Sequence, residues 1–296
     1  MDRFDSMAML VSVVEAGSLS AASRKLATPI ATVSRKISQL EAHLGTKLLN
    51  RSSRRLTLTD AGRSYVMACR RILEEVGEAE RAASGEYRAP KGELILAAPI
   101  VFGRLHVLPV VVEFLETFSQ IDVRMVLSDR VVNLVEEHVD IAVRIGDLPD
   151  SSLVATRVDT IHRVACASPK YFTQRGMPES PAELGTHDCI TFESLMSPKE
   201  WTFGHGKSEV SVPVHSRLVV NTAEAAIDAA ISGIGITRVL SYQVAEPVRA
   251  GKLALALQAF EPKPWPLSLV YTERRLLPIK VRTFLDFATP RLKSRL

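Results

Sequence analysis

Two helical patterns separated by a very short connection constrain the fold of this chain more than any other feature. Ser18 is a favourable N-cap for a helix over residues 19–26. Thr28 can cap the next helix, and Pro29 suits its first position because no N–H is needed there. One face of this second helix is apolar, with spacings of 4, 3 and 4 residues between Val33, Ile37, Leu40 and Leu44. Gly45 predicts the end of the helix.

The opposite face of the second helix carries small or polar side chains around one arginine, namely Ala31, Thr32, Ser34, Arg35 and Ser38. Such a face can approach the floor of a DNA groove. Residues 48–51 and 55–58 are predicted to form two short strands around residues 52–54. This hairpin would present cations to phosphates or to a minor groove. The pattern therefore predicts a winged helix-turn-helix that grips duplex DNA.

The predicted DNA contacts come from the start of the first helix, from the second helix and from the hairpin. They are Ser18, Ser20, Ile30, Ala31, Thr32, Ser34, Arg35, Arg51, Arg54 and Arg55. The alternative is a small helical domain with a solvated basic turn, but capping, apolar spacing and arginine placement agree with one another. Residues 1–72 hold 12 Lys and Arg against 5 Asp and Glu, whereas the remainder of the chain is mildly acidic. A basic N-terminal segment followed by a mildly acidic remainder is typical of a nucleic-acid-binding domain joined to another domain.

The three cysteines, Cys69, Cys166 and Cys189, lie far apart and form no C-x-x-C motif. We expect free buried thiols in a reducing cytoplasm, with a redox pair between Cys166 and Cys189 as the alternative. The first residues do not resemble a signal peptide, and no apolar run is long enough to span a bilayer. A soluble, cytoplasmic protein is therefore expected.

A long helix is predicted from residue 60 to about residue 87. Its small and apolar residues follow a heptad-like seam formed by Tyr65, Cys69, Ile72, Val76, Ala79 and Ala83. Such a stripe needs a partner, either a second copy or the body of the protein, and we favour the second copy. The predicted domains are a winged helix-turn-helix (1–59), a dimerising linker helix (60–89) and a C-terminal domain (90–296).

The C-terminal domain begins with alternating strand and helix patterns. Strands are predicted at residues 94–98, 123–127 and 141–145. Helices are predicted over residues 102–118, with an interruption before Pro109, and over residues 131–137, with Ser128 or Asp129 as the cap. This β-α-β order predicts a parallel sheet covered by helices on both faces.

A second α/β unit is predicted to start near Arg163. Its strands are expected at residues 164–167, 217–220 and 253–257. Ser168 opens one helix, and Thr222 caps another over residues 223–231 that Gly233 closes. The final strand and helix, at residues 267–271 and 278–287, look like the missing edge of the first unit. The two lobes are therefore expected at residues 91–160 with 267–296 (lobe 1) and at 161–266 (lobe 2), with crossings near 158–163 and 262–267.

Several motifs resemble those of the LysR-type transcriptional regulators. They are found at residues 18–22 (SLSAA), 31–35 (ATVSR), 40–48 (LEAHLGTKL), 56–62 (LTLTDAG), 140–146 (DIAVRIG) and 233–236 (GIGI). The resemblance covers nearly the whole chain. It implies an α/β fold class with an N-terminal winged helix-turn-helix, a long linker helix and a two-lobed, periplasmic-binding-protein-like effector domain. It also implies double-stranded DNA, a small-molecule co-inducer and further copies of the chain as partners, with RNA polymerase as another candidate and no cofactor or metal.

The chain departs from this family at two places. Many members have glutamine and proline where this chain has Ile30 and Ala31. Many also have a serine or threonine that binds a carboxylate after the first strand of the effector domain, where this chain has residues 99–102 (PIVF). The usual base-contacting glutamine and the usual carboxylate-binding hydroxyl are therefore both missing.

The effector site is expected in the cleft between the two lobes, because strand ends and helix N-termini converge there in open α/β sheets. The candidate residues are Ile100, Val101, Ser128, Asp129, Arg144, Thr222 and Thr237. In the alternative interpretation, Ser128, Asp129 and Thr222 only cap helices, and Arg144 only pairs with a nearby acid.

Two other functions were weighed. An enzyme is disfavoured because the chain has no dinucleotide-binding, P-loop, nucleophile-elbow or H-E-x-x-H motif. A zinc site at His205 and His215 lacks further ligands at suitable spacing. An architectural protein that binds DNA without sequence preference would rarely carry a two-lobed α/β body of about two hundred residues. A ligand-responsive, sequence-specific regulator is the favoured function.

Overall fold

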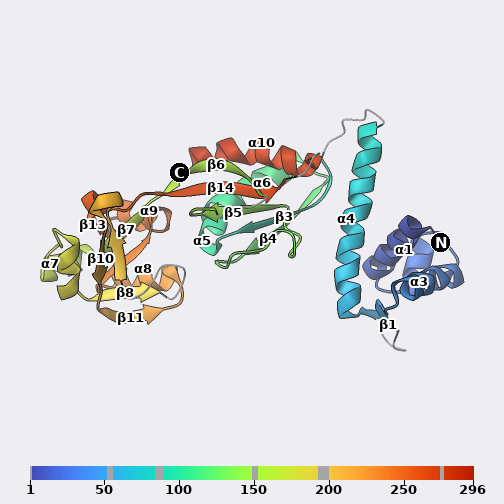
Figure 1. Ribbon diagram of the computed structural model, residues 1–296, viewed down its shortest axis with the longest axis horizontal. Coiled ribbons are helices and arrows are strands. Elements are labelled where there is room, and N and C mark those ends of the chain that lie inside the picture. Colours follow the sequence, from blue (N-terminus) through green and yellow to red (C-terminus); the bar gives the residue numbers. More distant parts are fainter. Residues whose placement is uncertain (1, 52–55, 84–89, 149–152, 193–199, 274–276) are drawn as a thin grey trace. The chain divides into compact units, whose positions relative to one another are not determined.

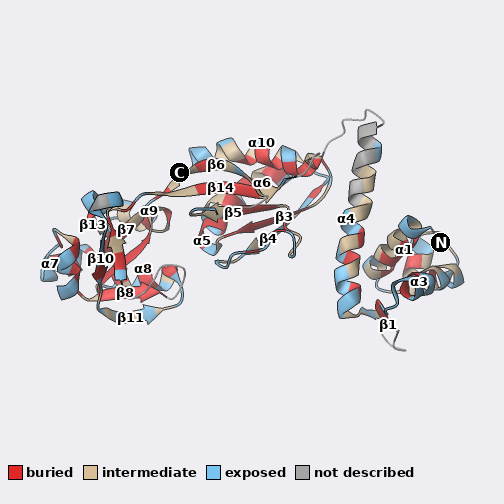
Figure 2. Ribbon diagram, in the orientation of Figure 1, coloured by how far each residue is buried: buried red, intermediate tan, exposed pale blue. Residues whose placement is uncertain are grey.

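The computed structural model describes residues 2–51, 56–83, 90–148, 153–192, 200–273 and 277–296. The chain forms two compact units, Met1–Ala89 and Pro90–Leu296. Figure 1 shows a helical first unit that ends in a long helix, and a second unit built on β-sheets. The buried residues in Figure 2 lie between the helices of the first unit and along the strands of the second.

Three helices of the first unit share one apolar core: α1 (Arg3–Ala16), α2 (Leu19–Lys25) and α3 (Ile30–Leu44). Val33, Ile37 and Leu40 of α3 are buried as predicted, whereas Leu44 is exposed at the end of the helix. The sequence patterns did not predict α1, which buries Met9, Leu10 and Val13. In the described part of the chain, no single helix has the length and apolar composition of a membrane span, although α1 and α2, bent by 114°, meet that criterion as a pair.

The ends of these helices agree with the sequence at two of three predicted positions. Ser18 caps α2, because its Oγ accepts a hydrogen bond from the N–H of Ala21 at 3.1 Å. Gly45 ends α3 in the left-handed region, at φ 65°. The prediction for the start of α3 was wrong. Pro29 lies at the N-cap rather than inside the helix, and the Thr28 hydroxyl donates to the carbonyl of Leu26 instead of capping α3.

The hairpin and the long helix follow α3 directly. Strands β1 (Leu49–Arg51) and β2 (Leu56–Leu58) pair in antiparallel fashion, and the hairpin tip, with Arg54 and Arg55, lies outside the described residues. Helix α4 (Asp60–Ala83) packs Tyr65 and Val66 against the core of the first unit. Part of the predicted seam thus packs within the chain itself. The predicted extension of the helix to residue 87 lies outside the described residues.

The first sheet of the second unit has the strand order β4-β3-β5-β14-β6. The strands are β3 (Gly92–Ala98), β4 (Ile121–Leu127), β5 (Ile141–Ile145), β6 (Leu153–Ile161) and β14 (Trp265–Thr272). Strand β3 is parallel to β4 and β5, but β14 is antiparallel to β5 and β6. The three strands predicted to be parallel, β3, β4 and β5, are parallel, but the sheet as a whole is mixed because β14 runs against its neighbours. The final strand does join the first sheet, although as an inner strand and not at an edge.

One face of this sheet is covered by helices that share a large apolar core. They are α5 (Ile100–Phe102), the π-helical turn η1 (Gly103–Val107), α6 (Leu108–Thr117) and α10 (Ile279–Ser294). Phe102, Phe114 and Phe284 are fully buried there. The π-helical turn lies just before Pro109, which confirms the interruption predicted at that point. Proline lacks an N–H and its ring disturbs the preceding turn, so the hydrogen-bond register changes.

The opposite face is covered by residues 131–139, and the helix predicted over residues 131–137 was wrong. This segment forms turns, and it buries Val132, Leu134 and Val139 against the sheet. The side chain of Asn133 accepts a hydrogen bond from the N–H of Val135, and the N–H of Asn133 donates to the Glu137 carboxylate. These bonds replace the backbone pattern that a helix would need.

The second sheet has the order β11-β8-β12-β7-β13. Its strands are β7 (Arg163–Ala167), β8 (Cys189–Phe192), β11 (Ser216–Val220), β12 (Ile236–Leu240) and β13 (Ala254–Ala256), and the helices around it are α7 (Pro169–Arg175), α8 (Ala223–Ile231) and α9 (Ser241–Arg249). A separate hairpin, β9 (Glu200–Phe203) with β10 (Val210–Pro213), and the 3-10 turns η2 (Pro181–Thr186), η3 (Gly206–Ser208) and η4 (Gln258–Phe260) complete the lobe.

The caps predicted in this lobe are confirmed, whereas the cysteine pair is not. The hydroxyls of Ser168 and Thr222 accept hydrogen bonds from the first turns of α7 and α8. Cys166 and Cys189 belong to core clusters on the two opposite faces of the sheet, and β12 lies between their strands. The alternative of a redox pair between them is therefore wrong, and both thiols are free and buried.

Two connections join the sheets, and one side chain packs across the boundary. Strand β6 passes through His162 into β7, and the chain returns along β14, which pairs with β6 at Trp265 and Ile161 (Figure 1). Tyr242 of α9 belongs to the apolar core of the first sheet, with its ring 5.2 Å from that of Phe102. The core of the first lobe is thus completed by a residue of the second.

Candidate nucleic-acid interface and ligand pocket

The outer face of α3 is the first candidate surface. Ile30, Ala31, Arg35 and Ser38 are exposed, and Thr32 and Ser34 are half-buried. Val33 and Ile37 anchor the inner side of the helix, so these outer side chains are held together on a rigid element. Arg35 has no hydrogen-bond or ion-pair partner among the residues that the structure describes. Its guanidinium is therefore available to a phosphate or a base edge.

Other cations near α3 are engaged within the unit. Lys36 forms an ion pair with Asp5, and Lys25 forms one with Glu15 at 3.1 Å. The Ser20 side chain is exposed on α2, next to the Ser18 cap. The start of α2 thus presents N–H groups and hydroxyls, which suit a phosphate.

The hairpin is held to α3 by a residue that sequence reasoning missed, Glu41. Only 2% of its side chain is exposed, and its Oε1 accepts hydrogen bonds from the N–H groups of Leu48 at 2.9 Å and Leu49 at 3.1 Å. Burial raises the pKa of Glu41, but these bonds and Lys47 outweigh it, so the pKa lies below the ordinary glutamate value. A lone acid beside the apolar stripe of α3 was the available signal.

The predicted contacts of the hairpin are only partly described. The backbone of Arg51 pairs with Leu56 in the β1–β2 ladder, and its side chain lies outside the described part, as do Arg54 and Arg55. The N–H of Leu48, just before β1, donates to Glu41 and so links the base of the hairpin to α3.

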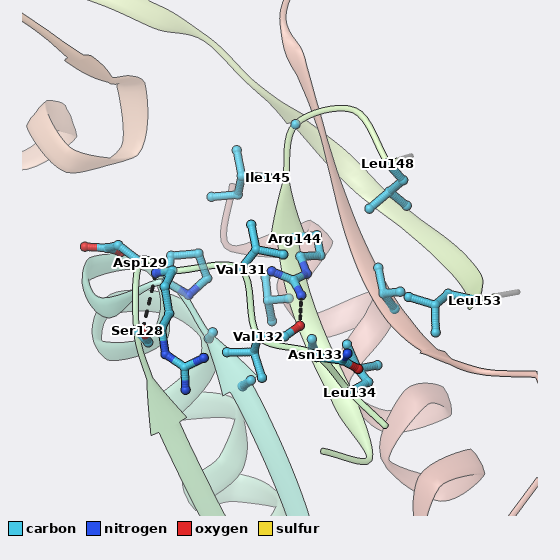
Figure 3. A pocket seen from close by; sticks show the side chains of 18 of the residues that line it. Ser128, Asp129, Val131, Val132, Asn133, Leu134, Arg144, Ile145, Leu148 and Leu153 are labelled. Atoms are coloured by element: carbon cyan, nitrogen blue, oxygen red, sulfur yellow. Dashed lines mark hydrogen bonds between the residues drawn. The ribbon is translucent and has the colours of Figure 1, made fainter. Parts of the chain in front are cut away.

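A pocket of about 470 Å³ lies at the carboxyl ends of β3, β4 and β5. Figure 3 shows Ser128, Asp129 and Arg144 around it, together with apolar side chains. The described apolar walls are Ala97, Val131, Val132, Leu134, Ala142, Leu148, Leu153 and Val270. Its size is typical of sites for small organic molecules, and its place matches the strand-end rule for open α/β sheets.

Arg144 is the cation that lines this pocket from β5. Its Nη2 donates to the carbonyl oxygen of Val132, and the dashed line in Figure 3 marks this bond. Burial lowers the pKa of the Arg144 guanidinium, and the nearby carboxylate of Glu137 offsets part of that change. Glu137 itself pairs with Arg130, whose Nη1 donates to the Oε1 of Glu137 at 2.7 Å. Arg144 therefore keeps donors for a ligand that carries an acceptor.

Ser128 and Asp129 line the same pocket but are also engaged locally. The Ser128 hydroxyl accepts from the N–H of Arg130 at 3.2 Å, and the Asp129 carboxylate accepts from the N–H of Ile100 at 3.0 Å. Asp129 thus binds the first N–H of α5, whereas the helix that Ser128 or Asp129 was expected to cap, over residues 131–137, is absent. Both side chains have acceptor capacity beyond these single hydrogen bonds.

The other predicted ligand residues do not join this pocket. Val101 is buried in the core and Ile100, although exposed, is outside the lining. The Thr222 hydroxyl caps α8, and the fully buried Thr237 hydroxyl donates to the carbonyl of Ile190 at 3.1 Å. All described lining residues belong to the lobe of the first sheet, so this pocket differs from the expected cleft between lobes. In the described ranges, no cluster of three potential metal ligands is found.

Two family models match the chain. The model of the bacterial regulatory helix-turn-helix protein, lysR family, matches residues 4–63, and the model of the LysR substrate binding domain matches residues 88–293. Together they cover the outer face of α3 and the pocket.

Similar proteins match this chain over most of their length. An HTH-type transcriptional repressor of Pseudomonas aeruginosa is 33% identical, with 97% of this chain and 91% of that protein covered. The HTH-type transcriptional activator AaeR of Escherichia coli is 31% identical, with 98% and 94% covered. The structure of CrgA, a LysR-type transcriptional regulator from Neisseria meningitidis, matches with a TM-score of 0.62 and 31% identity over 97% of this chain and 98% of that chain.

Proposed function

Because the chain belongs to the LysR family of transcriptional regulators, we propose that it binds its DNA site through the outer face of α3 and the hairpin. We propose further that a small molecule in the pocket of the first sheet controls this binding. The chain is a DNA-binding transcriptional regulator with an effector domain and not an enzyme. We propose which residues contact the DNA and the effector, and how copies of the chain assemble.

The observation that carries the DNA proposal is Arg35, which has no partner among the described residues and lies beside small side chains on the exposed face of α3. Arg35 can form a bidentate contact with a guanine, and Ile30 and Thr32 can contact thymine methyl groups. Ser18, Ser20, Ala31 and Ser34 are proposed to lie against the backbone or base edges, and Arg51, Arg54 and Arg55 to reach the phosphates or the minor groove beside them.

The first prediction tests this face directly. Operator fragments would be selected from genomic DNA, and binding of the full chain measured by fluorescence anisotropy at fixed salt. Arg35→Ala is expected to weaken operator binding by roughly 1–3 kcal/mol and to relax preference at one base pair. The matched control, Arg249→Ala on the exposed end of α9, should bind as the original does. Unchanged affinity of the Arg35 variant would remove this residue from the interface.

Competition with unrelated DNA separates regulation from general DNA packaging. A sequence-specific regulator should prefer its operator by about 10³-fold or more. A ratio near unity would favour the architectural alternative.

The second prediction tests the pocket. A panel of small metabolites would be screened by thermal melting, because a ligand that binds the folded chain raises its Tm. We expect hits with an apolar body and an acceptor group, and we expect Arg144→Gln to lose the Tm shift while the exposed Arg157→Gln in β6 keeps it. An equal shift in the Arg144 variant would place the ligand elsewhere.

Self-association is proposed from exposed apolar side chains along η1 and α6. Leu105, Leu108, Val112 and Leu115 follow spacings of 3, 4 and 3, and all are exposed. Such a stripe favours contact with a second copy. A homodimer or homotetramer would place two α3 helices about one helical turn apart on an interrupted palindrome. We propose a cytoplasmic location, where chromosomal DNA is available, and RNA polymerase as a further partner at the promoter.

A further inference from the structure

Two arginines of the second lobe, one buried and one half-buried, have no acidic partner at ion-pair distance among the described residues. Arg238 of β12 is 8% exposed, and Arg163 of β7 is half-buried. Arg163 is paired with Leu240 in the antiparallel β7–β12 ladder, and Arg238 lies two residues from Leu240. Diagonal neighbours of this kind share one face of a sheet and lie within reach of each other's long side chains. The two guanidiniums are therefore close together on one face of the second sheet.

Aromatic rings hold both guanidiniums in place. The Arg163 guanidinium carbon lies 4.4 Å from the centre of the Trp265 ring, and that of Arg238 lies 4.9 Å from the centre of the Phe203 ring. Stacking of this type fixes the plane of a guanidinium and leaves its N–H groups pointing sideways. Both groups are therefore ordered before any ligand arrives.

The hydrogen bonds of this pair are incomplete. Arg238 donates from Nη2 to the carbonyl of Thr202 at 2.6 Å, but the Nε atoms of Arg163 and Arg238 are both buried and have no hydrogen-bond partner within the described part of the chain. No carboxylate of the described residues reaches ion-pair distance from either group, and the charge of Glu209 acts on Arg163 only from farther away. Burial, followed by the neighbouring Arg163, lowers the pKa of Arg238 to about 10.

The guanidinium groups of Arg163 and Arg238 thus carry positive charge that no nearby carboxylate of the described residues neutralises. A buried cation and a half-buried cation that repel each other cost free energy unless an anion or a full set of hydrogen bonds compensates them. Arginine does not escape this cost by losing its proton at neutral pH. An oxyanion would supply both the charge and the missing acceptors, because a carboxylate or phosphate accepts paired hydrogen bonds from guanidinium groups.

We propose that Arg163 and Arg238 form a binding site for a small oxyanion in the second lobe, distinct from the pocket of the first sheet. Neither arginine lines that pocket. Arg163 directly follows the connection from β6, and Trp265, against which it stacks, begins the return strand β14 (Figure 1). An anion at this pair therefore acts on both strands that join the lobes, and its binding stiffens them relative to the second sheet.

The test measures the Tm of the full chain while chloride is replaced by phosphate, sulfate or acetate at constant ionic strength. The effective oxyanion is expected to raise the Tm by roughly 3–5 °C at about ten times its Kd. A larger effect of phosphate or sulfate assigns a tetrahedral oxyanion, and a larger effect of acetate assigns the carboxylate of an organic ligand. Absence of any rise above chloride overturns the proposal.

Variants separate the site from general salt effects, since sulfate stabilises many proteins without binding to a site. Arg163→Gln is the main variant because its side chain is half-exposed, and it should lose the anion-specific rise in Tm. Arg249→Gln, an exposed arginine on α9, should keep the rise. Isothermal titration of phosphate into both variants provides a direct second measurement. An equal response of the Arg163 and Arg249 variants overturns the proposal.

Arg238→Met gives an independent signature of the same site. Methionine has a similar length and no charge, so it removes the uncompensated cation while filling the space beside Phe203. We expect a higher Tm than that of the original chain in chloride, together with loss of the anion response. A retained anion response in this variant overturns the proposal.

Discussion

At the scale of single residues, Glu41 carries much of the geometry of the DNA-binding unit. Its buried carboxylate accepts hydrogen bonds from two consecutive N–H groups at the base of the hairpin, and the Nζ of Lys47 lies 3.1 Å from its Oε2. This side chain therefore links the hairpin to α3 directly, in addition to the apolar packing of Leu48 and Leu49. Hydrogen bonds to a charged acceptor contribute more than neutral ones, and an unsatisfied buried N–H costs free energy.

The third prediction concerns the loss of this acceptor. Glu41→Ala should lower the free energy of unfolding of the first unit by about 1–3 kcal/mol. Glu41→Gln, which keeps an acceptor oxygen but no charge, should lose less. Chemical denaturation followed by circular dichroism would measure both. A variant with alanine that is as stable as the original would show that the N–H groups of Leu48 and Leu49 need no acceptor.

The pH dependence of Glu41 follows from the direction of its shift. Its pKa is lower in the folded chain than in the unfolded chain. Its contribution to stability is fully present above the ordinary glutamate pKa, about 4.3, and is lost as the pH falls through the lowered value. The glutamine variant should lack this part of the acid dependence.

Residue-level predictions from the sequence succeeded where a short-range rule applies. The caps Ser18, Ser168 and Thr222 depend on neighbours within three residues, which the sequence displays directly. Thr237 was proposed as a ligand residue, yet its hydroxyl is buried against Ile190, which lies on another strand. Such long-range partners are set by the sheet and cannot be read from local patterns.

At the scale of elements, the contact between α4 and the base of the hairpin depends on the absence of a side chain. A Cβ at Gly62 would lie 2.0 Å from the carbonyl oxygen of Leu48. Thr59 adds a second link, because its hydroxyl accepts from the N–H of Gly62 and donates to the carbonyl of Lys47. The first turn of α4 is thus packed directly on the backbone of the preceding segment.

The fourth prediction is that Gly62→Ala lowers the stability of the first unit by roughly 3 kcal/mol, because the obstacle is backbone and cannot rotate away. Gly185→Ala is the matched control. A Cβ at Gly185 meets nothing within 4 Å, so that variant should be neutral or slightly more stable. Thermal melting followed at a signal of the first unit would compare them. Equal stability of the two variants would contradict the tight approach of α4.

Elements were predicted well where an apolar pattern agreed with a signal at one helix end, as with Gly45 at the end of α3 and Thr222 at the start of α8. The failure at residues 131–137 has a physical cause, since Asn133 and Glu137 bind nearby backbone N–H groups and favour turns. The direction of β14 could not be read from its apolar pattern either. Pairing direction depends on the path by which the chain returns from the second lobe.

At the scale of the whole molecule, the two large sheets of the second unit are linked by a connecting strand and by one aromatic side chain. Strand β14 leaves the second lobe and becomes an inner strand of the first sheet, while Tyr242 from α9 completes the core beside Phe102. A change at either sheet can therefore reach the other through the connecting strands and this aromatic contact. Two lobes and two chain crossings were predicted from the sequence. The aromatic contact was not, because nothing local to Tyr242 marks its distant partner.

The fifth prediction concerns the assembly proposed for the α6 stripe. Leu108→Glu combined with Val112→Glu places two charges where an apolar partner surface is proposed, so the number of chains per particle should fall. Sedimentation velocity would measure this, with Met177→Glu as a control at an exposed apolar residue outside the stripe. Operator affinity should fall by about 10²-fold, because two linked half-sites are read better than two separate ones. If the double variant keeps the original particle mass, the copies associate through another surface, and the apolar seam of α4 becomes the next to test.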